Sequence, residues 1–321
     1  AAAAPILLNV VLIGTMLTAA FLGVGNSADA GIVLAWGVAV AGTLQLLMLA
    51  YAAYRAGVGL GFRRPRLTPD VRRLLTLGVP GVIAGGITQI NIAIGTIIAS
   101  LQAGAVSYLY YADRIYQLPL GVVGIAIGVV LLPDISRKLR AGDMLAVQDS
   151  QNRALEFCLL LTVPAAVALF VMAEPICRVL YERGAFTTSD ASATAWALAA
   201  FAAGLPSFVL IKVFQPAFFA REDTRTPMWF AMINLIVNAA GSIALFYGLL
   251  AAGFRPHTGI AIATSVSGWI NAILLWGALK RRGHFALDRR TVRVLPMLLL
   301  SSLVMGLALL LATHLAAPFV G

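Results

Sequence analysis

Charge is scarce in this chain, and its scarcity argues against a soluble globular domain. Only 11% of the 321 residues are charged, whereas 60% are hydrophobic and the mean hydropathy is +0.92. Soluble domains carry roughly 25% charged residues, because a folded chain must present polar surface to water. Lipid is therefore the expected solvent, and membrane lipids are the expected neighbours.

Cysteine and histidine are also few, which leaves little material for catalysis or metal binding. Cys158 and Cys177 lie 19 residues apart in what reads as one helix, about 28 Å along its axis and too far for a disulfide. The three histidines, His257, His284 and His314, are scattered, and P-loop, HExxH and GxSxG motifs are absent. The sequence predicts no catalytic residue, metal or cofactor, and favours a protein that is not an enzyme.

Long apolar runs fill the rest of the sequence. A spanning helix needs about 20 mostly apolar residues, and nine stretches with short connections qualify. The chain begins AAAAPILLNVV, without Met and already apolar, so we expect a piece of a longer protein. The predicted fold is an all-α, polytopic transmembrane helix bundle with spans at about 5–24, 31–54, 76–101, 105–132, 154–173, 190–220, 228–250, 258–279 and 294–317.

The 23 Lys and Arg residues are divided unequally between the two sides of the predicted bundle. If the spans alternate in direction, eighteen lie in the loops after the second, fourth, sixth and eighth spans, and three lie on the other side. The positive-inside rule makes the basic side cytoplasmic, with the first residue cytoplasmic and the last one outside. The net charge of +10 is explained in this way without a nucleic-acid partner.

Two basic residues remain inside predicted spans, Arg114 and Lys212. Arg114 lies roughly 14 Å deep, where a charge costs about 2.5–3.5 kcal/mol. We interpret it as facing a water-filled cavity and an anionic ligand, and its fork of donors suits phosphate; a structural role between helices is the alternative. Asp113, about 100° away on the helix, is expected to orient Arg114 or to reach another helix. Gln117 shares the face of Arg114, and Lys212 can also snorkel towards the surface.

The same span contains residues that favour bending. Pro119 removes a backbone donor and favours a kink, and Gly121, Gly124 and Gly128 give the following turns a small surface. Two interpretations remain open, a bend that lets the helix move and close helix packing alone.

Polar residues at helical spacing mark three further spans. They indicate either helix packing or a shared hydrophilic interior. The candidates for a polar or ion-binding cluster are Asn91, Asn234, Asn238 and Thr264.

Long segments of the chain resemble one known family. YYADRIYQLPLGVVGIAIGVVLLPDISR (110–137) closely resembles the signature of the lipid II flippase family MurJ, also called MviN. GVPGVIAGGITQINIAIGTIIASL (78–101), ERGAFTTSDASATAWAL (182–198) and IKVFQPAFFAREDTRTPM (211–228) resemble the pattern of that family in the same order. The resemblance extends over nearly the whole chain.

This resemblance implies a fourteen-helix, two-lobe fold of the multidrug/oligosaccharidyl-lipid/polysaccharide exporter superfamily. The chain would supply helices five to thirteen. Residues 1–57 would be the last two helices of the first lobe, and 58–75 a basic cytoplasmic linker. The second six-helix lobe would occupy 76–282, and 283–321 would begin the extra C-terminal helix pair.

The resemblance also implies a function. The family moves lipid II, an undecaprenyl diphosphate carrying a muropeptide, from the cytoplasmic to the outer leaflet of the bacterial inner membrane by alternating access. Arg114 matches a family cavity arginine that meets the diphosphate, Asp113 would position it, and Pro119 with the nearby glycines would permit rocking. The alternative is a related exporter of another polyprenyl-diphosphate oligosaccharide or of drugs.

Coupling to sodium or to the membrane potential is the last expectation that the resemblance raises. Some family members use an Asp on the seventh helix for sodium. The matching position here is Gly95, which weakens the case for sodium, and Asn234 and Asn238 would be remnants of such a site.

Overall fold

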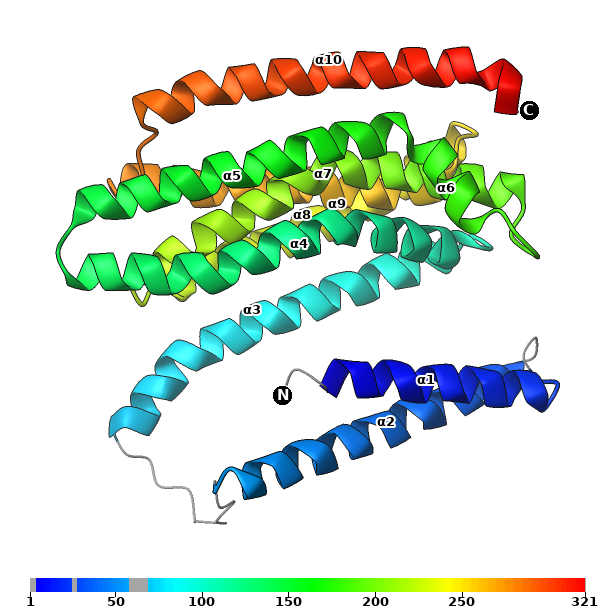
Figure 1. The fold of residues 1–321 in the computed structure, drawn as a ribbon, viewed down its shortest axis with the longest axis horizontal. Helices are drawn as coiled ribbons and strands as arrows, with labels where there is room; N and C mark the ends of the chain where they lie inside the picture. Colours follow the sequence, from blue (N-terminus) through cyan, green and yellow to red (C-terminus); the bar gives the residue numbers. More distant parts are fainter. Residues whose placement is uncertain (1–3, 25–27, 58–68, 321) are drawn as a thin grey trace. The chain divides into compact units, whose positions relative to one another are not determined.

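The computed structural model describes residues 4–24, 28–57 and 69–320, and every regular element within these ranges is an α-helix (Figure 1). Eight of the helices are long and apolar enough to cross a membrane, and Ile6–Phe21 is a shorter apolar helix. The predicted class, a multi-pass helical membrane protein, is confirmed. Within the described residues, this shorter helix corresponds to the first of the nine predicted spans. The chain divides into two compact units, Ala1–Thr68 and Pro69–Gly321.

The first unit contains a hairpin of α1 (Ala4–Phe21) and α2 (Ala28–Arg55). The two helices approach closely where Gly37 of α2 faces Thr15 of α1, since a Cβ at Gly37 would lie 2.5 Å from the Thr15 Oγ1. Large apolar side chains such as Phe21 and Trp36 are exposed. Small residues between helices and large apolar residues outside are expected for helices surrounded by lipid.

The second unit is a bundle in which the loops alternate between two ends. The α4–α5, α7–α8 and α9–α10 loops lie at one end, here called the basic end, and α6 lies at the other, the α6 end (Figure 1). Its helices are α3 (Pro69–Ala99), α4 (Ala105–Arg140), α5 (Met144–Val171), α6 (Ala173–Tyr181), α7 (Thr188–Phe219), α8 (Arg225–Ala251), α9 (Pro256–Arg281) and α10 (Arg289–Val320).

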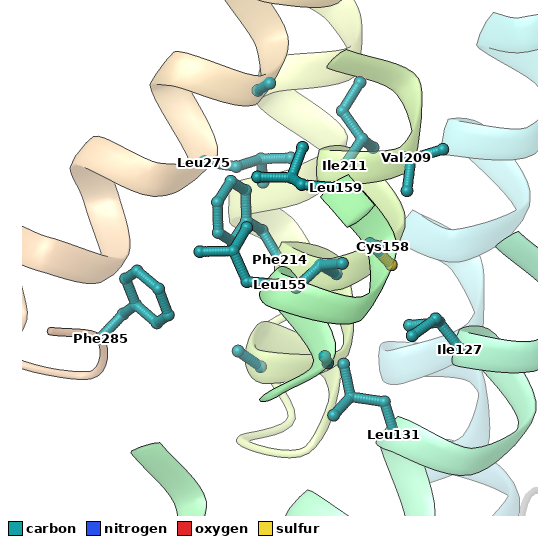
Figure 2. Close-up of a cluster of buried hydrophobic side chains, with 14 of the residues drawn as sticks. Ile127, Leu131, Leu155, Cys158, Leu159, Val209, Ile211, Phe214, Leu275 and Phe285 are labelled. Atoms are coloured by element: carbon teal, nitrogen blue, oxygen red, sulfur yellow. The ribbon is translucent and has the colours of Figure 1, made fainter. Parts of the chain in front are cut away.

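The centre of this bundle is α7, which packs against α4, α5, α6 and α9, while α10 runs along α5 (Figure 1). An apolar core joins α4, α5, α7 and α9 towards the basic end (Figure 2). Phe285, from the α9–α10 loop, is buried in it edge-on to Phe214, with ring centroids 5.7 Å apart. The start of α10 is therefore fixed to the core by its preceding loop.

Glycine ends three of these helices. Gly142, Gly253 and Gly283 follow α4, α8 and α9 with φ of 74°, 74° and 68°, a conformation in which a Cβ is strained. Side-chain caps begin other helices. Thr187 caps α7 through a capping box with Asp190, in which each residue satisfies a free backbone donor of the other.

Several boundaries differ from the predicted ones. α3 begins at Pro69, inside the predicted linker, and the rest of that linker, 58–68, lies outside the described residues. α4 continues to Arg140 and α5 begins at Met144, because their polar ends leave the apolar region as helix. Hydropathy detects the apolar part of a helix and not its polar extensions.

The prediction that Cys158 and Cys177 share one helix is wrong. Cys158 is on α5 and Cys177 on the short amphipathic helix α6, which begins directly after Met172. Both thiols are free and buried. The apolar run ends with α5, because Glu174 and Arg178 follow on α6, and hydropathy does not report that a second helix begins there.

Candidate functional site

Arg114 lies on the third turn of α4, with 53% of its side chain exposed. Its guanidinium stacks over the ring of Tyr110, one turn earlier, with 4.7 Å between the guanidinium carbon and the ring centroid. Its Nη2 lies 3.7 Å from the Oδ2 of Asp113. The stack covers one face of the planar group and leaves donors at its edge for a ligand.

Asp113 turns out to be paired within its own helix. Besides Arg114, its carboxylate accepts a hydrogen bond from the amide of Gln117, one turn later. The interpretation that Asp113 reaches another helix is therefore not what the structure shows. The Oδ2 of Asp113 is the atom that both the Gln117 amide and the Arg114 guanidinium approach, and the interpretation that Asp113 orients Arg114 stays a prediction.

An aromatic cluster adjoins this site at the α6 end. Tyr110 meets Tyr111 edge-on, with centroids 6.0 Å apart, and Tyr111 packs against Tyr181 and Phe186 at 4.7 and 5.4 Å. The hydroxyl of Tyr181 donates to the backbone oxygen of Tyr111 at 3.3 Å. α6 and the loop after it are thus bound to the turn of α4 that carries Arg114.

The residues predicted to bend α4 lie in different environments. α4 runs through Pro119 as one helix, although proline cannot donate to the carbonyl of Ile115. A Cβ at Gly121 would have no neighbour within 4 Å, and one at Gly124 would meet the Cγ of Lys212 at 3.7 Å. Gly128 lies on α4, but its surroundings are outside the described residues. Of these glycines, Gly124 is the one with a described packing partner on another helix.

Lys212 of α7 is exposed, and its stem passes over Gly124. Gly124 follows Arg114 by ten residues, about 15 Å along the helix. The structure therefore places both cationic residues along α4 but does not join Lys212 to the Asp113, Arg114 and Gln117 cluster.

Three of the four candidates for a polar cluster meet between α3, α8 and α9. The amide of Asn238 donates to the Oδ1 of Asn91 at 2.7 Å. The Oδ1 of Asn238 accepts from Thr264 at 3.3 Å and from Ser242 at 3.4 Å. Asn234 lies one turn away on α8, and its Oδ1 is buried without a hydrogen-bond partner among the described residues.

These four side chains offer a sodium ion no charged ligand. Hard cations prefer oxygen ligands, with carboxylates among them, and all four residues are neutral. The side-chain oxygens of Asn91 and Asn238 already accept hydrogen bonds from neighbouring groups. The residue of α3 that contacts α8 here is Asn91, whereas Gly95, one turn later, faces Ile260 of α9. The cluster holds three helices together by neutral hydrogen bonds.

Sequence reasoning missed two members of these clusters. Tyr110 precedes Arg114 by four residues, and Ser242 follows Asn238 by four. Residues four apart lie on one face of a helix, so this spacing could have identified both.

The bundle defines a class, a multi-pass helical membrane protein. A solved multidrug resistance MATE family transporter of the MOP superfamily, in an outward-facing conformation, shares the fold. It has a TM-score of 0.55 and 18% identity, and the match covers 79% of this chain and 58% of that one.

The family follows from closer matches. The family description Lipid II flippase MurJ matches residues 1–320, and the chain belongs to that family. A probable lipid II flippase MurJ of Rhizobium meliloti (strain 1021) is 50% identical over 312 residues, which are 97% of this chain and 57% of the relative. A solved lipid II flippase MurJ in an inward closed conformation has a TM-score of 0.74 and 25% identity, covering 96% of this chain and 60% of that one. The chain thus spans less than two thirds of these relatives.

Proposed function

We propose that the protein containing this chain moves lipid II from the cytoplasmic to the outer leaflet of a bacterial inner membrane by alternating access, for cell-wall synthesis. The observation that carries the proposal is Arg114, half-exposed on an apolar helix of a chain in the lipid II flippase family. A cation at this depth is costly unless it faces water or a ligand. The basic end is cytoplasmic in this proposal, which places the first residue in the cytoplasm and the last one in the periplasm.

Arg114 would bind the diphosphate of lipid II. A guanidinium can donate to two phosphate oxygens at once, and the stack on Tyr110 restricts its rotation before the ligand arrives. Asp113, held by Gln117, would keep the group in place between transport cycles. Lys212 would be a second, separate cation along the path of the substrate.

Movement would come from one lobe rocking against the other. Pro119 and the open surface at Gly121 give α4 a place where the backbone is less constrained. The neutral Asn91, Asn238 and Thr264 cluster favours the membrane potential over sodium as the driving force, because moving one charge through 100 mV supplies about 2.3 kcal/mol. The function is transport and not catalysis.

The test uses the full-length protein in cells depleted of their own copy, with outer-leaflet lipid II as the readout. Arg114→Ala is expected to abolish exposure of lipid II. Arg114→Lys is expected to reduce it severalfold, because Lys retains the charge but loses the fork.

The matched control is Arg178→Lys. Arg178 lies on α6 with 49% of its side chain exposed, close to the value for Arg114, and pairs with Glu174 at 2.7 Å. Protein level and melting temperature are measured for each variant, so a folding defect is recognised. Wild-type lipid II exposure with Arg114→Ala would refute the binding role.

A further inference from the structure

A groove of about 470 Å³ lies between α4 and α5 near the basic end. It is not part of the Arg114 site. Ile127, which lines it, follows Arg114 by thirteen residues, and at about 100° per residue this places the two on opposite sides of α4. The groove is therefore a separate feature of α4.

The lining is divided along its length. Towards the middle of α4 it consists of Ile127, Val130, Leu131 and Phe157, with Val130 69% and Phe157 50% exposed. Figure 2 shows Ile127 and Leu131 at the edge of the apolar core, on the α4 side. Towards the basic end the lining becomes polar. Such a groove fits an amphipathic molecule with its chain along the membrane and its head at the surface.

The α4 side of the polar part is cationic. Asp134 is shared by two cations, Lys138 at 2.8 Å and Arg137 at 3.0 Å, and also accepts from Ser150 at 2.7 Å. One carboxylate cannot neutralise both bases. Lys138 uses two of its three donors on Asp134 and Ser150. A further donor remains for an anionic group in the groove.

The α5 side of the polar part is anionic. Arg153 is shared by three carboxylates, those of Asp149, Glu156 and Asp288. Arg290 pairs with Glu156 as well, at 3.5 Å, so three acids are matched by two cations. Asp149 is 66% exposed and makes its ion pair with Arg153 at 3.3 Å. Because Arg153 is divided among three acids, Asp149 retains negative charge for a cationic group. It adjoins Ser150, which Lys138 contacts, so the two charged sides face each other across the groove.

We propose that this groove binds a membrane phospholipid whose headgroup carries both a phosphate and a primary ammonium, that is, a phosphatidylethanolamine. The phosphate lies against Lys138, the ammonium lies against Asp149, and one acyl chain lies along Val130 and Phe157. Arg137 does not line the groove and acts through Asp134, whose charge it shares with Lys138. A choline headgroup lacks the N–H donors for Asp149, and a glycerol headgroup lacks the positive charge.

The experiment compares three phospholipids with the same acyl chains and ethanolamine, choline or glycerol headgroups. Each is added to purified full-length protein in detergent, and the rise in melting temperature is measured at increasing lipid concentration. The ethanolamine lipid is expected to act at a severalfold lower concentration than the other two.

Val130→Trp fills the apolar part of the groove and leaves every charge in place. Its matched control is Val129→Trp, because Val129 is 68% exposed on the same helix but does not line the groove. Val130→Trp is expected to remove the preference for ethanolamine, and Val129→Trp to keep it. Asp149→Asn should make the glycerol and ethanolamine lipids equivalent.

Three results would overturn the proposal. The three lipids could act equally on the unaltered protein. The two tryptophan variants could behave alike. The ethanolamine preference could persist in both Val130→Trp and Asp149→Asn. None of these results requires a Lys138→Gln variant, which would also break the contact of Lys138 with Asp134.

Discussion

The crossing of α7 and α9 should be intolerant of a single methyl group at Gly204. A Cβ there would lie 2.4 Å from the Oγ of Ser265 and 2.9 Å from its backbone Cα. A side chain can rotate away, but a Cα cannot, so Gly204→Ala must push the helices apart. Ser265 also donates to the backbone oxygen of Ala200 at 2.6 Å, a bond that the separation would weaken.

The expected cost follows from these two effects. Overpacking costs about 1–3 kcal/mol, and an interhelical hydrogen bond in a membrane protein is worth about 0.6 kcal/mol. At about 2–4 °C per kcal/mol, Gly204→Ala should lower the melting temperature of the purified full-length protein by at least about 3 °C. Scanning fluorimetry in detergent measures this directly.

The matched control is Gly277→Ala on α9, where an added Cβ has no neighbour within 4 Å. Alanine favours a helix by about 0.5–1 kcal/mol over glycine, so this variant should be neutral or more stable. Adding Ser265→Gly to Gly204→Ala moves the Cβ from one helix to the other and should restore part of the loss. Equal melting temperatures for Gly204→Ala and Gly277→Ala would show that the two helices do not cross as closely as the structure has them.

Three further predictions concern charge and exposure. Burial alone would raise the pKa of Asp223, but hydrogen bonds from Thr226 and Arg282 outweigh it and lower the pKa. The stabilising contribution of Asp223 is therefore present above the unfolded pKa of about 3.9 and is lost as the pH falls through the lower folded pKa. Asp223→Asn should for this reason flatten the acid limb of a profile of melting temperature against pH. Asn238→Asp should create sodium-dependent stabilisation that the unaltered protein lacks, measured by melting in sodium against potassium; a sodium effect already present without the substitution would contradict the neutral cluster. Burial, with the Glu174 carboxylate nearby, raises the pKa of the Cys177 thiol to about 12, so maleimide should label it far more slowly than Val179→Cys, whose position on the same helix is 78% exposed, and equal rates would count against that burial.

The positions of the helices could be predicted from the sequence because lipid imposes one strong requirement. Each span must satisfy its own backbone and cover it with apolar side chains, so hydropathy finds the spans. It could not find α6, because Ala173–Tyr181 is too short to span a membrane. Nor could it select the cap of α7, where Thr187 forms the capping box because Asp190 lies three residues after it.

The Arg114 site shows a different limit. Neighbouring side chains lie about 100° apart on a helix, which argues against a pair between Asp113 and Arg114, yet the guanidinium is long enough to come within 3.7 Å of the carboxylate. Helical angle places the Cβ atoms, whereas side-chain length decides which charges meet. The contact of Lys212 with Gly124 was beyond prediction for another reason, since it depends on how α4 and α7 cross.

These contacts also constrain how α4 can move. Near its start the hydroxyl of Tyr108 donates to Asp190 of α7 at 2.7 Å, and near its end Ser150 of α5 donates to Asp134 at 2.7 Å. A bend at Pro119, between the two, would displace one half of α4 relative to its neighbours and strain one of these bonds. If both bonds persist during transport, α4 must move together with α5 and α7. In that case Pro119 affects the local geometry of α4 and leaves the carbonyl of Ile115 without its helical donor near Arg114, and the whole bundle moves as one.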